Sequence, residues 1–261
     1  MSPVEHLTVE TRGAVAVLTI DRPAKRNAMS AAMWAALPGV LAGIAADPGV
    51  RVLVVTGAGG SFCAGADIGD LLGGDDADDP MAGVRRDNLA AQAALRDFPA
   101  PTLAMVRGHC IGGGVELAVA CDLRFTDPTG VFGVTPAKVG AVYTPGSTRA
   151  LLDLVGPATT KHLLLSGELV DATEALRSGL VDRVVPAEEL EGEVLRYAEV
   201  LASRSALSQR ATKEVVAALV AGRDGQAEAA RWYRATIATG ELAEGVAAFT
   251  ERRSPRFPSA R

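Results

Sequence analysis

The apolar residues of the chain follow two successive patterns. Up to about residue 143, short apolar runs typical of strands alternate with longer stretches of helical period. From about residue 144 the spacing is helical almost throughout, apart from one more strand-like run at 180–186. Alternating strands and helices followed by helices predict an α/β core with a helical C-terminal part. We expect the core to occupy residues 1–200 and the helical region residues 201–261.

Local signals place the elements of the first half. Two strand-like runs at 6–11 and 14–20 flank a short turn and predict a hairpin. Ser30 is a suitable N-cap for a helix reaching about Ala46. The run VRVLVVTG at 50–57 is continuous and rich in β-branched residues, which favours a parallel sheet covered on both faces. Further strands are expected at 99–108, 122–127 and 130–134, and a helix at 81–97.

Capping residues mark helices in the second half. Thr144 followed by Pro145 has the form of an N-cap with proline at the first helical position. Asp171 is a predicted N-cap, with Glu174 as its capping-box partner and Gly179 as the stop signal. Three or four further helices are expected to close the chain.

Charge and cysteine content argue against several classes of protein. The net charge is −5 and no long basic run occurs, so neither nucleic acid nor an anionic membrane is expected as a partner. The three cysteines form no CxxC pair and the three histidines share no ligand spacing, so we predict no metal site and a reducing, cytoplasmic location. The chain has no secretory signal pattern and no charge-free apolar segment of about 18 residues.

Residues 73–80, GGDDADDP, form an acidic break of low complexity. We interpret this break as a mobile surface loop, because it has too little apolar surface to pack. A metal site is the alternative, but the spacing does not fit an EF-hand loop.

Two loops of small residues carry the chemistry that the sequence suggests. SFCAGAD at 61–67 and CIGGGVE at 110–116 each lie shortly after a predicted buried strand. Loops of this kind open at the carboxyl edge of a parallel sheet, where ligands bind. Bare N–H groups in such loops can form an anion site or an oxyanion hole. The alternative is that the glycines serve only turns or close helix–sheet packing.

One carboxylate lies next to the second loop. Glu116 is three residues past Gly113, about one helical turn along, so it is expected to face the same pocket. The helix N-terminus would favour its ionised form, whereas an apolar wall would oppose ionisation. Glu116 is therefore a candidate general acid or base, with a helix-capping carboxylate as the alternative interpretation.

Several segments, in order along the chain, resemble the crotonase superfamily, which includes enoyl-CoA hydratases and isomerases. They are RPAKRNAMS, SFCAGADI, GHCIGGGVELAVACDLRF, LLLSGELVDATEALRSGLVDRVVP and AAFTERRSPRF. The resemblance implies a spiral of ββα units and a helical C-terminal region that builds a homotrimer or homohexamer. It also implies an acyl-CoA thioester as the substrate, with coenzyme A as part of that substrate and no permanently bound cofactor.

The resemblance also implies roles for individual residues. The N–H groups of Ala66 and Gly113 would hold the thioester oxygen, on which negative charge develops in an enolate. Glu116 matches one of the two catalytic glutamates of enoyl-CoA hydratases. The residues expected to hold the adenine and pantetheine parts through backbone groups are Ala28, Ala64, Asp67 and Ile68.

The chain departs from the hydratase pattern at one position. The second glutamate of hydratases falls on Pro136, which cannot titrate or hold a water molecule. Thr135, Lys138 and Tyr143 are polar residues of the same segment, which is expected to be a loop entering the pocket. The segment resembles the equivalent part of the family's decarboxylases, whose tyrosine contacts substrate, although those enzymes carry a histidine where this chain has Ala66.

Three hypotheses follow from this mixture. The first is an enoyl-CoA hydratase or isomerase using Glu116. Isomerisation tolerates the lack of a second glutamate at position 136 better than hydration does, because one carboxylate can move one proton. The second is a decarboxylase of methylmalonyl- or ethylmalonyl-type carboxyacyl-CoA using Glu116 and Tyr143. The third is a non-catalytic member that binds acyl-CoA.

Overall fold

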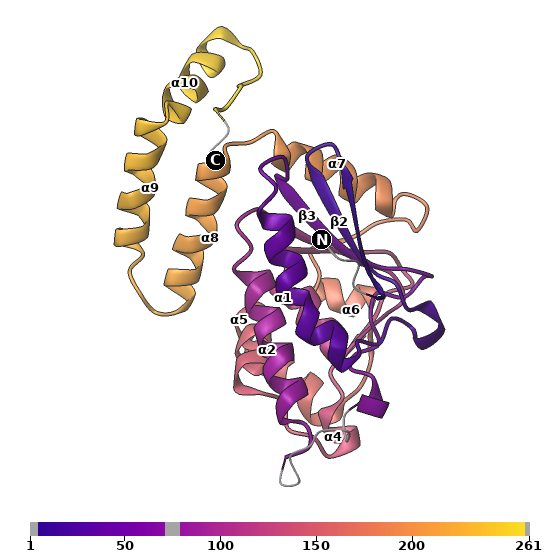
Figure 1. Ribbon diagram of the computed structural model, residues 1–261. Coiled ribbons are helices and arrows are strands. Elements are labelled where there is room, and N and C mark those ends of the chain that lie inside the picture. Colours follow the sequence, from indigo (N-terminus) through magenta and orange to yellow (C-terminus); the bar gives the residue numbers. More distant parts are fainter. Residues whose placement is uncertain (1–4, 71–78, 259–261) are drawn as a thin grey trace.

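The computed structural model describes residues 5–70 and 79–258 (Figure 1). Its main sheet has six strands in the order β1-β2-β3-β4-β6-β9. Strands β1 and β2 form the predicted antiparallel hairpin, and every other neighbouring pair is parallel. The strands are β1 (Leu7–Arg12), β2 (Val15–Ile20), β3 (Val52–Gly57), β4 (Thr102–Val106), β6 (Leu123–Thr126) and β9 (Arg183–Val184).

A second, three-stranded sheet carries the glycine-rich loop. It consists of β5 (His109–Ile111), β7 (Val131–Gly133) and β8 (Val170–Asp171). Strand β7 lies between the other two, parallel to β5 and antiparallel to β8. Because β5 ends directly before the three consecutive glycines, this small sheet fixes where the next helix begins.

The helices confirm most of the predicted boundaries. Ser30, Thr144 and Asp171 each accept a hydrogen bond from the backbone N–H three residues later, as N-caps do. The carboxylate of Glu174 bonds to Arg177, so its predicted part in a capping box is wrong. The helices are α1 (Ala31–Ala45), α2 (Ala82–Arg96), α3 (Gly113–Ala120), α4 (Pro136–Val139), α5 (Pro145–Ser166), α6 (Ala172–Arg177), α7 (Leu190–Ala202), α8 (Ala206–Val220), α9 (Gln226–Ala238) and α10 (Glu241–Glu251), with short 3₁₀ turns at Pro23–Lys25 and Ile68–Asp70.

Strand β3 is buried on both faces, as its continuous apolar run predicts. Leu53 and Val55 belong to a cluster that includes Trp34 of α1, whereas Val52 and Val54 belong to a cluster that includes Leu190 of α7. Successive side chains of a strand point to opposite faces, so helices cover both sides of the sheet.

Helices α8, α9 and α10 form an arm that extends from the end of α7 (Figure 1). Helix α8 is tied to the core by Lys213, which bonds to Asp122, whereas α9 and α10 project outward. No residue of α9 is buried.

The division of the chain near residue 200 stays a prediction. Most of the acidic segment at 73–80 lies outside the described residues. Among the described residues, no helix is long and apolar enough to cross a membrane.

Candidate active site

The first loop runs alongside the segment that precedes α1. The Ala64 N–H donates to the Arg26 carbonyl (3.0 Å), the Met29 N–H to that of Gly65 (2.8 Å), and the Asp67 N–H to that of Met29 (2.8 Å). This ladder skips the N–H of Ala66, which donates no hydrogen bond within the described part of the chain.

The second loop lies directly against the first. The Ile111 N–H donates to the Cys63 carbonyl at 2.9 Å. Gly112 has φ 53°, a left-handed conformation that favours glycine. A Cβ on Gly114 would lie 2.2 Å from the Cys63 oxygen, so only glycine allows the helix to start this close to the neighbouring loop. Close packing therefore explains part of the glycine run, in line with the alternative that the glycines serve turns and close packing.

Gly113 brings the two loops to a common point. A Cβ on Gly113 would lie 3.6 Å from the Ala66 nitrogen, and a Cβ on Gly65 would lie 3.5 Å from the Gly113 nitrogen. As the first residue of α3, Gly113 has no intrahelical partner for its N–H, and the described residues provide no other acceptor. Two unengaged N–H groups thus lie side by side, an arrangement that can stabilise a developing oxyanion.

Glu116 lies in the first turn of α3, which starts at Gly113. Its Oε2 accepts a hydrogen bond from Asn88 Nδ2 of α2 at 2.8 Å. Burial raises the pKa of Glu116 above its ordinary value, while hydrogen bonds from Ser147, Asn88 and Tyr143 oppose the rise. A half-buried carboxylate under these opposing influences is suited to proton transfer.

The structure brings Tyr143 together with Glu116, as the sequence suggests. Tyr143 lies close enough to Glu116 for the charge of that carboxylate, and hydrogen bonding to it, to add to burial in raising the pKa of the phenol well above its ordinary value. The phenol therefore remains neutral and can act as a donor toward the carboxylate. Tyr143 supports Glu116 from the residue just before the N-cap of α5.

The segment that contains Pro136 differs from its prediction as a loop. Pro136 is the first residue of α4, and Gly140 ends this short helix with a φ of 70°. Lys138 is exposed, and its Cγ would lie 3.1 Å from a Cβ on Gly167 at the end of α5. Within residues 5–70 and 79–258, the hydrogen-bond partners of Glu116 are amide and hydroxyl groups, and none is a second carboxylate.

The predicted coenzyme A-binding residues lie on the ladder between the first loop and the segment before α1. The N–H groups of Ala28, Ala64 and Asp67 all donate to main-chain carbonyls. Arg22, which the sequence did not single out, donates from Nη1 to Asp67 Oδ2 (2.6 Å) and to the Ala28 carbonyl (3.2 Å). The hydrogen bond between Arg22 and Asp67 is the largest of the effects that lower the pKa of Asp67. Ile68 begins the adjoining 3₁₀ turn.

Sequence reasoning also missed a polar network behind Glu116. Gln92 Nε2 donates to Asn88 Oδ1 at 2.7 Å and to Ser147 Oγ at 3.0 Å. Asn88, Gln92 and Ser147 are all buried. The only sign of this network in the sequence was the spacing of Asn88 and Gln92, four residues apart on one face of a predicted helix. Their other partners come from distant elements, so no local pattern identifies them.

His109 and the three cysteines have structural surroundings. The His109 ring lies 3.4 Å from Ser61 Oγ and 3.5 Å from Arg26 Nη1. All three cysteines are buried and free, and burial raises the pKa of the Cys63 and Cys121 thiols to about 12. The described residues contain no cluster of side chains that could hold a metal ion.

Comparisons with known proteins match nearly the whole chain. A family model described as enoyl-CoA hydratase/isomerase matches residues 10–260. The chain is 34% identical to a probable enoyl-CoA hydratase of Mycobacterium tuberculosis, over 97% of this chain and 98% of that protein. It is 35% identical to (E)-benzylidenesuccinyl-CoA hydratase of Thauera aromatica, over 97% of this chain and 99% of the relative.

Solved structures agree with this match. An enoyl-CoA hydratase/isomerase family protein from Hyphomonas neptunium superposes with a TM-score of 0.91 at 35% identity, covering 97% of this chain and 98% of that one. An enoyl-CoA hydratase/carnithine racemase from Magnetospirillum magneticum gives a TM-score of 0.92 at 32% identity, covering 98% and 97%. The predicted α/β fold is therefore confirmed as one shared with crotonase-type structures.

Proposed function

The chain belongs to the enoyl-CoA hydratase/isomerase family, and we propose that it binds an acyl-CoA thioester with its carbonyl oxygen between the N–H groups of Ala66 and Gly113. The observation that carries this proposal is the pair of unengaged N–H groups with Glu116 in the same helical turn. Glu116 is the acid/base, and Ala28, Ala64, Asp67 and Ile68 contribute backbone groups to the binding of coenzyme A. Coenzyme A enters only as part of the substrate, and no permanent cofactor takes part.

The chemistry follows from where charge develops. The ionised Glu116 removes a proton from a carbon next to the unsaturated or thioester group, and the electron pair moves onto the thioester oxygen. The two N–H groups stabilise that enolate, and removing one such donor typically costs on the order of 100-fold in rate. Returning the same proton to another carbon completes a double-bond isomerisation with one carboxylate. Addition of water also needs a group to orient that water, and the residue at the expected position is Pro136.

The direct test replaces Glu116 by glutamine and measures two reactions. Crotonyl-CoA hydration is followed by loss of enoyl absorbance, and 3-enoyl-CoA isomerisation by its gain. We expect kcat to fall by roughly 100-fold or more for the reaction that the wild type performs, with KM little changed. An unchanged rate would rule out Glu116 as the acid/base.

The contact between Tyr143 and Glu116 favours decarboxylation of a carboxyacyl-CoA as the second candidate. Loss of carbon dioxide leaves the enolate directly, so this reaction needs little proton abstraction. Release of carbon dioxide from methylmalonyl- or ethylmalonyl-CoA, abolished in Tyr143→Phe, would support it, and silence on both substrates would exclude it. Tight thioester binding without turnover in any assay would instead indicate a non-catalytic acyl-CoA-binding protein.

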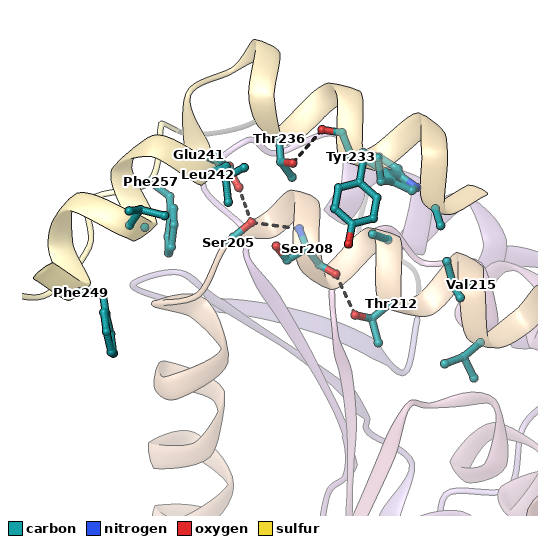
Figure 2. Close-up of a pocket in the computed structure, with 16 residues that line it drawn as sticks. Ser205, Ser208, Thr212, Val215, Tyr233, Thr236, Glu241, Leu242, Phe249 and Phe257 are labelled. Carbon is teal, nitrogen blue, oxygen red and sulfur yellow. Dashed lines mark hydrogen bonds between the residues drawn. The ribbon is translucent and has the colours of Figure 1, made fainter. Parts of the chain in front are cut away.

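We propose that further copies of the chain cover the arm formed by α8, α9 and α10, giving a homotrimer or homohexamer. Figure 2 shows the groove between these helices, with Tyr233, Phe249 and Phe257 among the residues that line it. The groove has a volume of about 720 Å³, and Phe249 is 87% exposed. Apolar surface of this extent is typical of an interface. The family match and the net charge of −5 without a long basic run favour a cytoplasmic enzyme without nucleic-acid or membrane partners.

Sedimentation velocity tests the assembly. Phe249→Glu, which places a charge in the groove, is expected to shift the protein from oligomer to monomer. Thr250→Glu changes the next exposed residue of α10, outside the groove lining, and serves as the matched control. A monomeric wild type at micromolar concentration would overturn this part of the proposal.

A further inference from the structure

The carboxylate of Glu116 rests on a relay of buried polar groups from two helices. Asn88 of α2 donates to Glu116 Oε2 at 2.8 Å, and Gln92, one turn further along α2, donates to Asn88 Oδ1 at 2.7 Å. Gln92 also donates to Ser147 Oγ of α5 at 3.0 Å. The exposed fractions of Asn88, Gln92 and Ser147 are 9%, 3% and 3%. The relay is thus almost fully shielded from water.

The bond from Gln92 decides which end of the Asn88 amide faces Glu116. An asparagine amide has one acceptor end and one donor end. Because Gln92 occupies the oxygen of Asn88 as a donor, the nitrogen of Asn88 is left for the carboxylate. The reverse orientation would place the Asn88 oxygen against a carboxylate oxygen, two acceptors without a proton between them. Buried polar groups avoid such pairs, since neither partner can be satisfied.

We propose that Gln92 is a positioning residue: it orients the Asn88 amide and through that amide holds the Glu116 carboxylate beside the N–H groups of Ala66 and Gly113. Gln92 forms no hydrogen bond with Glu116 itself, so it acts only through other residues. The inference rests on the proposed acid/base role of Glu116. It gives a function to Gln92, a buried side chain that takes no direct part in the proposed reaction.

Among the residues that the structure describes, the titratable groups that act on Glu116 bring no charge of their own to its carboxylate. They are the Tyr143 phenol, from the residue before α5, and the Cys63 thiol, from the first loop. Both have pKa values raised mainly by burial and are neutral at physiological pH. Amide and hydroxyl donors are therefore what oppose the effect of burial on Glu116. Loss of the Asn88 donor should raise the pKa of Glu116 further.

The test titrates Glu116 directly by ¹³C NMR, with glutamate labelled at the carboxyl carbon and the signal assigned by its loss in Glu116→Gln. In Gln92→Met, which removes the amide but keeps the side-chain length, we expect the titration midpoint of Glu116 to move up by about one pH unit. Leu95→Met, a change at another buried position of α2, should leave the midpoint in place. An unchanged midpoint in folded Gln92→Met would overturn the proposal.

A double-mutant cycle separates positioning from packing. If Gln92 acts through Asn88, adding Gln92→Met to Asn88→Leu should produce little further shift, whereas a full additional shift would contradict the proposed route. If Gln92→Met does not fold, Gln92→Asn keeps the polarity while drawing the amide back from Asn88, and the same shift is expected. The NMR readout does not depend on turnover, so it is separate from the activity test of Glu116→Gln, whose failure would concern the proposed function alone.

Discussion

The main-chain nitrogen of Ala66 lies 3.6 Å from the point that a Cβ on Gly113 would occupy. The two residues are far apart in the chain and meet because the loop after β3 packs against the loop after β5. The same Cβ would approach Trp34 Cζ2 to 2.8 Å, so a side chain at position 113 would press on Trp34 and contact the Ala66 nitrogen.

Gly113→Ala should therefore damage catalysis more than folding. The added methyl group would press on Trp34 and narrow the space beside the Ala66 nitrogen, and we expect kcat/KM to fall by roughly 100-fold. Gly83→Ala is the matched control, because a Cβ there meets nothing within 4 Å. Steady-state kinetics with a thermal melt of each variant would check this. Normal activity in Gly113→Ala would show that the two N–H groups are not used.

The raised pKa of Glu116 has a consequence for stability. The folded state binds this proton more tightly than the unfolded chain does, so the stabilising contribution is present at low pH and is lost as the pH rises through the folded pKa. Glutamine cannot ionise and escapes that loss. The free energy of unfolding of Glu116→Gln relative to wild type should therefore increase from about pH 4 to about pH 8. Urea denaturation at both pH values measures it, and a difference that does not change with pH would contradict the account.

Asp67→Asn should weaken the binding of coenzyme A thioesters. The Arg22–Asp67 ion pair ties the segment before α1 to the first loop, and both side chains are mostly buried. We expect a roughly tenfold rise in Kd with kcat nearly unchanged, because the oxyanion N–H groups are not touched. Asp153→Asn, which removes an ion pair with Arg149 on α5, provides a control outside the loop. Isothermal titration with a saturated acyl-CoA checks both, and equal affinities would exclude a role for the pair.

Features encoded within one segment could be predicted from the sequence. The continuous apolar run of β3 indicated burial on two faces, and the caps at Ser30, Thr144 and Asp171 follow from local hydrogen bonding. The glycine run indicated bare N–H groups, but which glycine is needed for φ and which for close approach depends on Cys63 in another loop.

Features that depend on contacts between distant segments could not be predicted. The hydrogen bond from Gln92 to Ser147 joins residues 55 positions apart, and no local pattern links them. Glu174 fits a capping box by spacing, yet Arg177 competes for its carboxylate with a charged donor. The strand expected at 180–186 pairs with β6 only at Arg183 and Val184, so its apolar residues indicated burial without fixing the length of pairing.

A crystal structure with a bound, unreactive acyl-CoA analogue would show whether the two N–H groups hold the thioester. We expect the thioester oxygen at about 2.7–3.1 Å from the nitrogens of both Ala66 and Gly113. We also expect the carbon next to the thioester to face the Glu116 carboxylate. A thioester oxygen that contacts neither nitrogen, or an acyl chain that leaves the site without passing Glu116, would contradict this proposal.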